Sequence, residues 1–517
     1  MSENKEVTKA AGVVGAATLL SRIFGFVRDM VIAWVFGAGL AADAFFVAFR
    51  IPNLLRRLFA EGSLTVSFVP VFTEYLTKRG RKEAFELAGS VLRILSVILA
   101  IVSVVGILAA PFIVRIIAPG FTVSAEKFEI TVLLTRLMFP YIFFIALVAL
   151  CMGILNALGH FAAPALAPVF LNLAMIASVF GLAPFFERPV IGLAVGVLIG
   201  GALQLALQVP FLIKKGFFFW RRFPWYHPAV KRIGKLMTPA VFGSAVYQIN
   251  ILVGTLLASL LAEGSISYLY YADRLVQFPL GIFAVAVGTA VLPSLSRQAA
   301  SQDMDALRDT FAYALRLVFF ITIPAMIGLI VLRVPIIQLL FKRGAFDATT
   351  THLTAEALLY YALGLWAFSG VRIVVSTFYA LQDTKTPVKV AILSLLANIV
   401  LSIVLMGPMR HGGLALATSL SSMLNLTVLI WFLKKRLGRI GARNILKSAG
   451  TSIAASIVMG LALICFLSNI ELQGDINTIR LLMYVGLSIV GGIVIYGGLS
   501  RIFKSKELTA VIGMLRK

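Results

Sequence analysis

Cysteine and negative charge are both scarce in this chain of 517 residues. It has 22 Asp and Glu against 46 Lys and Arg, and only two cysteines, Cys151 and Cys465. Two cysteines so far apart in the sequence exclude a disulfide framework, and each is expected to be a small buried apolar side chain. Four histidines occur, no two of them at the spacing of metal ligands, so we expect no metal site.

The motifs of common enzyme classes are also missing. The chain has no Gly-x-x-x-x-Gly-Lys-Ser/Thr phosphate loop, no His-Glu-x-x-His pair and no Ser/His/Asp arrangement. The acidic residues of the apolar segments stand beside arginines, which would hold them ionised rather than ready for acid–base catalysis. We therefore expect a protein that is not an enzyme and that carries no cofactor.

Long apolar runs dominate what is present. The chain is 60% hydrophobic and only 13% charged, whereas a soluble domain is about a quarter charged. Runs of at least about 18 apolar residues recur from end to end, and the short alternating segments of a β-barrel are not seen. The sequence predicts an all-α polytopic membrane protein with fourteen transmembrane helices. The expected spans are 11–36, 43–75, 84–114, 128–157, 163–185, 190–213, 232–261, 265–296, 307–333, 352–381, 387–407, 412–433, 446–468 and 479–502.

The basic residues are unevenly distributed over the connecting loops. With the N-terminus in the cytoplasm, Lys and Arg gather on cytoplasmic segments, above all at 214–235 and 434–447, and are sparse on the outer loops. The positive-inside rule therefore predicts that both termini are cytoplasmic. The net charge of +24 is explained by this topology and by attraction to anionic lipid headgroups, so no nucleic-acid partner is expected.

The sequence also repeats itself weakly. FVPVFTEYL at 68–76 is similar to VLPSLSRQA at 291–299, and NALGHFAAP at 156–164 to YALQDTKTP at 379–387. An even number of spans in each repeat predicts two six-helix lobes in parallel orientation, one of the known transporter plans. The predicted domains are an N-lobe at 1–215, a cytoplasmic linker at 216–231, a C-lobe at 232–437, and two further spans with a tail at 438–517.

Polar residues inside the predicted spans are the candidate functional residues. On the second span, Arg50, Asn53, Arg57 and Glu61 recur at spacings that place them on one helix face, with Arg56 about 100° around. Arginines outnumber acids in this group, and an arginine at the bilayer centre costs roughly 2.5 to 3.5 kcal/mol. The candidates for a substrate-binding site are Arg22, Arg28, Asp29, Asp43, Arg50, Asn53, Arg56, Arg57, Glu61, Asp273 and Arg274.

Two interpretations of these charges compete. They can be structural ion pairs, such as Arg28 with Asp29, together with arginines that extend to the membrane surface. Alternatively, the excess arginines line a hydrated cationic cavity that binds an anion, because buried positive charge needs an anion or water. Arginine, unlike lysine, can bind phosphate or carboxylate through two parallel hydrogen bonds.

Four stretches resemble a known family. SRIFGFVRD at 21–29, GLAADAFFVAFRIPNLLRRLFAEG at 39–62, YYADRL at 270–275 and QDTKTPVK at 382–389 are similar to the MurJ (MviN) family, bacterial lipid II flippases of the MOP transporter superfamily. The resemblance implies a V-shaped pair of lobes that alternates between inward-facing and outward-facing states. It also implies transport of lipid II, the undecaprenyl-pyrophosphate-linked disaccharide-pentapeptide, from the inner to the outer leaflet of the bacterial inner membrane, for peptidoglycan synthesis.

The same resemblance implies roles for individual residues. The functional arginines and acid of the family fall on Arg22, Arg28, Arg56, Arg274 and Asp43, and Asp29, Arg57 and Glu61 lie in the same motifs. The expected partners are lipid II and membrane lipids, with the chain acting as a monomer.

Some family members resemble a sodium-coupled type with acids in the seventh and eleventh spans. This chain has Gln248, Asn250 and Asn398 there. Coupling to the membrane potential or to a monovalent ion is therefore expected instead of a defined sodium site. The competing functions are an O-antigen-type oligosaccharide flippase, another exporter of the same superfamily, and a membrane scaffold or receptor. A basic cavity argues against an exporter of cations.

Overall fold

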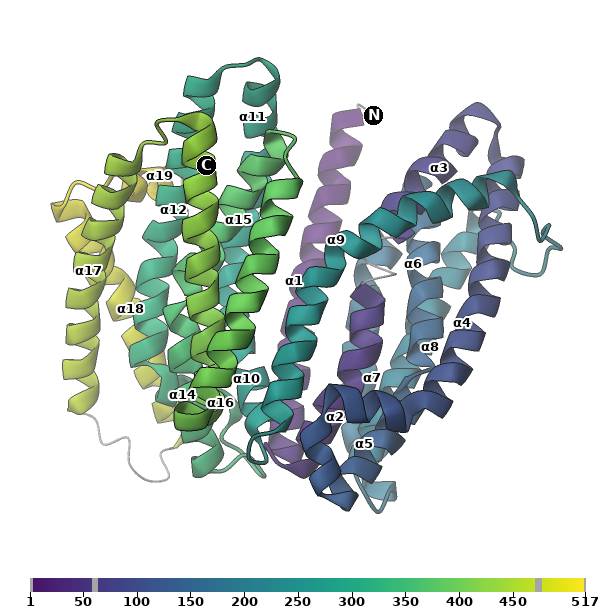
Figure 1. The fold of residues 1–517 in the computed structure, drawn as a ribbon, viewed down its shortest axis with the longest axis horizontal. Helices are drawn as coiled ribbons and strands as arrows, with labels where there is room; N and C mark the ends of the chain where they lie inside the picture. The colour runs from purple at the N-terminus through teal and green to yellow at the C-terminus, as the bar shows by residue number, and fades with distance from the viewer. Residues whose placement is uncertain (1–2, 58–63, 470–476, 516–517) are drawn as a thin grey trace. The chain divides into compact units, whose positions relative to one another are not determined.

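The computed structural model describes residues 3–57, 64–469 and 477–515, with side chains from residue 12 onward except at 65, 239–247 and 514–515. Every regular element in these ranges is a helix (Figure 1). The predicted all-α class is therefore confirmed. The chain forms two compact units, residues 1–266 and 267–517.

The first unit is built from long helices joined by short turns and two 3₁₀ turns. Its elements are α1 (Glu3–Phe36), α2 (Leu40–Leu55), α3 (Thr65–Lys78), α4 (Arg81–Ile117), η2 (Pro119–Val123), α5 (Ala125–Met138), α6 (Tyr141–Ala157), α7 (Ala162–Gly181), η3 (Ala183–Phe185), α8 (Val190–Lys214) and α9 (Pro228–Ser259).

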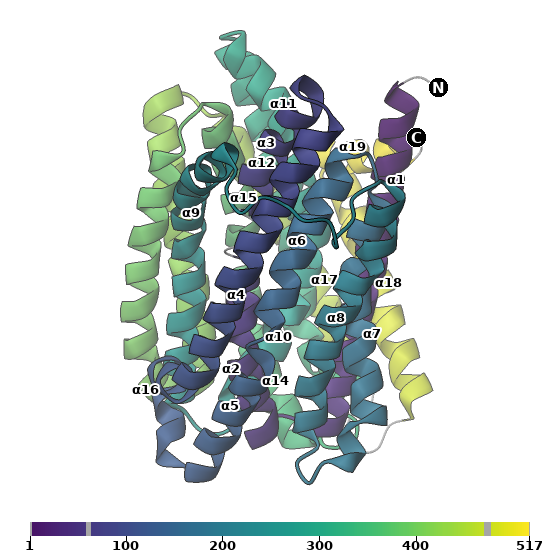
Figure 2. The ribbon, with the colours of Figure 1, turned by 90° about the vertical axis from the view of Figure 1, so that its right-hand side faces the viewer.

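Helix α6 lies at the centre of this unit, between α4 and α8 (Figure 2). It is apolar around its whole circumference, which is the pattern of a helix buried on all sides. The core around it includes Leu150, Ile154 and, from α3, Phe68, all of them buried. The outer helix α4 is different, because Leu108 and Phe112 remain 73% and 65% exposed. Large apolar side chains turned outward along a long helix are expected where lipid is the surrounding medium.

The predicted linker at 216–231 lies against α4. Phe223 stacks on Phe217, with ring centroids 5.5 Å apart, and the carbonyl of Phe223 accepts a hydrogen bond from Arg93. The hydroxyl of Ser90 donates to the carbonyl of Pro224 at 2.8 Å. After the linker, α9 packs against α3 and α4. The chain divides into its two compact units after Ile266. The lobes at 1–215 and 232–437, which were derived from the sequence repeat, stay a prediction.

The second unit begins within α10 and also consists of helices. Its elements are α10 (Ser265–Pro279), the π-helix η4 (Leu280–Ala284), α11 (Val285–Ala300), α12 (Met304–Val331), α13 (Arg333–Phe341), α14 (Ala348–Leu363), α15 (Leu365–Ala380), α16 (Lys385–Leu437), α17 (Ala442–Ser468), α18 (Thr478–Ile502) and α19 (Lys506–Leu515).

Helix α16 is long enough for two membrane crossings. At a rise of about 1.5 Å per residue, its 53 residues measure about 80 Å, against a hydrocarbon thickness of about 30 Å. It breaks at Arg410, whose φ of 49° and ψ of −130° are not helical. The break falls between the predicted spans 387–407 and 412–433, so the sequence located this turn correctly.

Nine helices of the described residues are long and apolar enough to cross a membrane. The pair α14 and α15, bent by 41° at the break between them, brings the number to ten. This fits the predicted polytopic membrane protein. The total of fourteen spans and the parallel repeat stay predictions, as do the orientations of the two termini.

Candidate substrate-binding site

Arg28 and Asp29 form a buried ion pair on α1. The guanidinium of Arg28 donates from Nε and Nη2 to Oδ1 of Asp29, at 3.0 and 2.6 Å. Its third nitrogen, Nη1, donates to Oδ1 of Asn172 on α7 at 3.0 Å. Arg28 is 7% exposed and Asp29 is 2% exposed. The ion pair expected under the structural interpretation therefore exists, and a neutral amide on another helix holds the same guanidinium.

Asn172 is a residue that sequence reasoning missed. Its amide nitrogen donates to the backbone carbonyl of Ser21 at 3.2 Å, while its oxygen accepts from Arg28. Asn172 is buried and lies in the middle of the apolar stretch of α7. A polar residue in the middle of a membrane span is a signal for function, and this signal was available in the sequence.

Arg56 follows the last residue of α2. Its Nε and Nη2 both donate to Oδ1 of Asn53, at 3.1 and 2.8 Å. The spacing argument had placed Arg57 on the face of Asn53 and Arg56 about 100° away. The structure shows a contact of Asn53 with Arg56, since residues three apart are also neighbours on a helix; the chain is π-helical at 56–57. Single π-turns of this kind are frequent at functional sites. The predicted place of Arg57 on this face stays a prediction.

The other candidates of the first two helices differ in exposure. Arg22 is exposed, and Arg50 and Arg57 are half-buried. Glu61 lies outside the described residues, so its predicted place on the face of Arg57 is not tested. Arg28 and Arg56 are each oriented by hydrogen bonds, to Asp29 and Asn172 and to Asn53 respectively.

Asp43, in the first turn of α2, is almost completely buried. Its Oδ2 accepts from Nζ of Lys127 at 2.8 Å and from the backbone N–H of Gly264 at 2.8 Å. Lys127 lies on α5, with its ammonium group 4.3 Å from the ring centroid of Phe121. The carboxylate of Glu263 accepts from the backbone N–H of Leu40 at 2.8 Å. The two acids therefore attach the turn after α9 to the beginning of α2.

Lys127 comes just before the predicted span at 128–157, in the loop that the sequence predicts between this span and the one before it. It is instead within α5, which begins at Ala125 with Ser124 as its N-cap, and it is buried with Asp43. The apolar run in the sequence starts at Phe128. The predicted start of the span was therefore one residue too late to include Lys127.

In the second unit, Arg274 lies on α10 beside Tyr270. Its Nη2 donates to the hydroxyl of Tyr270 at 2.8 Å, and its guanidinium lies 4.8 Å from the centroid of that ring. Asp273 is half-buried and accepts from Nε2 of Gln277 at 3.5 Å. A few residues on, the helix passes into the π-helical turn Leu280–Ala284 after Pro279. The YYADRL motif thus combines an oriented arginine with an irregular helix, as the end of α2 does.

Several other arginines of the predicted spans have local structural partners. Arg93 donates to the linker carbonyl described above, and Arg333 donates to the carbonyl of Ile330 at 2.6 Å. Arg316 on α12 lies 3.5 Å from the carboxylate of Glu507 on α19. For these three arginines the structural interpretation is sufficient, and we do not include them in the site.

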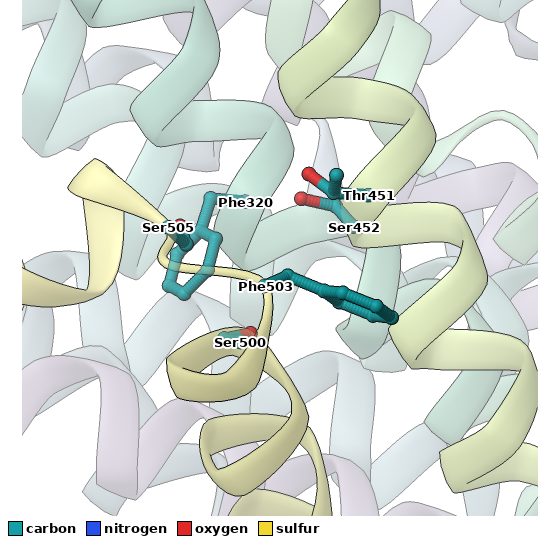
Figure 3. A pocket seen from close by; sticks show the side chains of 6 residues that line it. All are labelled: Phe320, Thr451, Ser452, Ser500, Phe503 and Ser505. Carbon is teal, nitrogen blue, oxygen red and sulfur yellow. The ribbon is translucent and has the colours of Figure 1, made fainter.

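A small recess lies in the second unit, and none of the candidate residues lines it. Figure 3 shows the hydroxyl groups of Thr451 and Ser452 extending from α17 toward the side where Phe320 and Ser505 lie. Ser500 and Phe503 complete its lining. The recess is too small for a lipid-linked saccharide. In the described ranges there is also no group of three or more His, Cys, Asp or Glu that could hold a metal ion.

Comparison with known proteins identifies close relatives of this chain. The family model described as "Lipid II flippase MurJ" matches residues 32–485. A protein of Vibrio cholerae serotype O1 named "Probable lipid II flippase MurJ" is 42% identical over 433 residues, which are 82% of each chain. A protein of Burkholderia cenocepacia named "Lipid II flippase MurJ" is 40% identical over 434 residues, 83% of this chain and 84% of the relative.

Solved structures give the same relationship. The structure titled "Lipid II flippase MurJ, inward closed conformation" matches 95% of this chain and 98% of its own, with a TM-score of 0.79 and 29% identity. An inward-facing multidrug resistance MATE family transporter of the MOP superfamily matches with a TM-score of 0.68 over 84% of this chain and 99% of its own, but at 15% identity. At that identity the second likeness shows the shared fold alone.

Proposed function

The chain belongs to the MurJ family of lipid II flippases, and from this premise we propose that it moves lipid II from the inner to the outer leaflet of the bacterial cytoplasmic membrane. Its role would then be transport by alternating access, for the supply of peptidoglycan precursor, and not catalysis. The observation that carries the proposal is Arg28, an arginine buried in an apolar helix and oriented by hydrogen bonds from two sides.

The chemistry of the substrate fits such arginines. A pyrophosphate carries at least two negative charges, and a guanidinium can bind it through parallel hydrogen bonds. Because a long charged side chain is free to adopt many rotamers, an arginine already held by an amide or a carboxylate loses less entropy when the anion binds. The structure supports this with Arg28, Arg56 and Arg274, each held by a neighbouring oxygen.

We assign the candidate residues as follows. The pyrophosphate-binding side chains are Arg22, Arg28, Arg50, Arg56, Arg57 and Arg274. Asn53 and Asp29 orient Arg56 and Arg28 through hydrogen bonds. We assign the same role to Asp273 and to Glu61, which lies outside the described residues. Asp43 contributes differently, because its buried pair with Lys127 and its bond to Gly264 make it an anchor for the turn after α9.

The setting follows from the same proposal. We place both termini in the cytoplasm, and the chain acts as a monomer among membrane lipids. The polyprenyl tail of the substrate stays in the lipid phase while the headgroup crosses. No bound cofactor or metal is needed, because the membrane potential or a monovalent ion can drive the movement of an anionic headgroup past cationic side chains.

An O-antigen-type oligosaccharide flippase is the competing function, and the test separates the two. A strain depleted of its own lipid II flippase would express this chain, and lipid II on the outer leaflet would be measured by cleavage with an enzyme added outside spheroplasts. We expect growth and outer-leaflet lipid II to be restored. The competing function would be right if two results came together. The chain would reach normal levels in the membrane without restoring outer-leaflet lipid II, and it would restore export of a lipid-linked oligosaccharide in a strain that lacks the corresponding flippase.

A further inference from the structure

We propose that Asn172 is a positioning residue for substrate binding: it fixes the guanidinium of Arg28 without cancelling its positive charge. The inference rests on the proposed function, because it assumes that Arg28 binds the pyrophosphate. Asn172 lies 144 residues from Arg28 in sequence, and the contact comes from the packing of α7 against α1.

The geometry gives both ends of the Asn172 side chain a defined task. Its oxygen accepts from Nη1 of Arg28 at 3.0 Å, and its nitrogen donates to the carbonyl of Ser21 at 3.2 Å. The two bonds fix which end of the amide faces the arginine, since only the oxygen can accept from a guanidinium. The amide thus connects two turns of α1 and holds Arg28 from the side opposite to the helix's own Asp29.

Gly25 lies beside the amide of Asn172. It lies between Ser21 and Arg28 on the same face of α1, and a Cβ atom added to it would be 3.5 Å from Nδ2 of Asn172. That is an ordinary contact distance, so the amide already fills the space beside the glycine. Asn172 is 6% exposed, and its two hydrogen bonds satisfy a polar group that would otherwise be costly in an apolar helix.

The chemical type of the residue matters as much as its position. Asp29 already supplies one carboxylate to Arg28, so the pair is close to neutral. A carboxylate at position 172 would lose the bond to the carbonyl of Ser21 but would accept a stronger, charge-assisted bond from the guanidinium. It would also give the cluster a net negative charge that repels a phosphate. A neutral amide supplies the orientation and leaves the charge unchanged. Binding of an anion therefore requires Asn, whereas folding alone would also accept Asp.

This difference gives an experiment in which lipid II binding should change while the stability of the fold does not. The purified full-length chain in detergent would be tested with Asn172→Asp, Asn172→Leu and the control Ser178→Ala, a buried polar change further along α7 that lies against Gly196. The measurements are the midpoint of thermal unfolding and the Kd for lipid II. We expect Asn172→Asp to unfold near the wild-type temperature and to bind lipid II about 10-fold or more weakly, as an unfavourable change of about 1.4 kcal/mol would give.

Asn172→Leu removes both hydrogen bonds and tests the route of the effect. We expect it to weaken lipid II binding by several-fold in the wild-type background. In a background with Arg28→Gln and Asp29→Asn, the same change should leave the Kd unaltered, because Asn172 acts only through Arg28. A merely structural Asn172 would lower the unfolding temperature and weaken binding together in both backgrounds, and that result would overturn the inference.

The outcomes also separate this inference from the proposed function. If the wild-type chain does not bind lipid II, the proposed function fails. If wild type binds but the Arg28→Gln and Asp29→Asn background binds equally well, Arg28 is not a ligand and Asn172 has nothing to position. If that background is weakened while Asn172→Asp binds like wild type, only the role of Asn172 is wrong.

Discussion

Asp43 and Lys127 form an ion pair with 2.8 Å between carboxylate and ammonium, and both side chains are nearly excluded from the surface. The two residues are 84 positions apart and join the first turn of α2 to α5. Because the same carboxylate accepts from the N–H of Gly264, one buried charge holds three segments of the first unit together. Both charges are buried, so removal of one leaves the other buried without this ion pair.

The first prediction follows from that burial. Lys127→Met should destabilise the protein by about 3–5 kcal/mol, because Asp43 remains charged and buried. Adding Asp43→Asn should recover much of this loss, since an amide oxygen can still accept from Gly264 and no charge remains. The measurement is thermal unfolding of the purified variants. Lys78→Met is the control, because its pair with Glu74 is exposed and should be worth about 0–1 kcal/mol. Equal loss in the single and double variants would contradict this account of the pair.

The second prediction separates folding from transport at Arg28. Arg28→Ala leaves Asp29 buried without its cation and should lower the amount of protein in the membrane. The double variant Arg28→Gln with Asp29→Asn keeps neutral, hydrogen-bonding side chains and should accumulate normally, yet it should not support growth of a flippase-depleted strain. Membrane levels would be compared by immunoblot. Growth of the double variant at the wild-type rate would show that Arg28 serves stability only.

Sequence reasoning predicted the helices well because the cause of each is local. Apolar runs of sufficient length define the spans, and the turn near residue 410 was evident from a short polar interruption at Arg410 and His411. Side-chain neighbours three or four residues apart can also be proposed from the sequence, but the spacing argument did not single out the contact of Arg56 with Asn53.

The contacts between distant helices could not be predicted in the same way. Asn172 meets Arg28 and Lys127 meets Asp43 only because α7 packs on α1 and α5 on α2, and one sequence does not give that packing. Each left a partial signal. Asn172 is a polar residue in the middle of an apolar run, and Lys127 comes immediately before one. Neither signal names a partner, so these contacts could not be assembled from the sequence.

The third prediction concerns orientation. The last turn of α16 carries Lys434, Lys435 and Arg436, and the positive-inside rule places this end in the cytoplasm. A reporter enzyme that is active only in the cytoplasm should therefore work when fused after Lys517. The same reporter inserted after Gly344, in a predicted outer loop, should be inactive. The opposite pattern would overturn the fourteen-span topology.

The fourth prediction is a pH dependence at Asp383, in the turn before α16. Partial burial raises the pKa of this carboxyl, but hydrogen bonds from Thr386 and Lys385 and the charge of Arg436 outweigh burial and hold the pKa below its ordinary value of 3.8. A carboxyl whose pKa is lower in the folded state stabilises the fold above its unfolded pKa, and this contribution disappears as the pH falls through the folded pKa.

Asp383→Asn should therefore lower the unfolding temperature at pH 7 and should match wild type more closely as the pH drops below about 3.8. Asp305→Asn is the control, because the side chain of Asp305 is 91% exposed in its pair with Arg308. A difference between Asp383→Asn and wild type that stays constant across this pH range would show that the charge of Asp383 contributes nothing.

The last prediction compares two adjacent arginines. Arg56 presents Nε and Nη2 to the single oxygen of Asn53, an arrangement that needs the planar guanidinium. Lysine at this position keeps the charge but loses both the fork that Asn53 holds and the two parallel bonds that a guanidinium can make to a phosphate. Arg56→Lys should therefore lose most transport, measured by complementation of a flippase-depleted strain at matched membrane levels.

Two further variants are compared with it. Arg57→Lys should retain more transport, because a point charge near the anion is sufficient there, and Asn53→Ala should resemble Arg56→Lys. Full and equal activity of both lysine variants would mean that charge alone matters at the end of α2, and that the oriented fork of Arg56 has no part in transport.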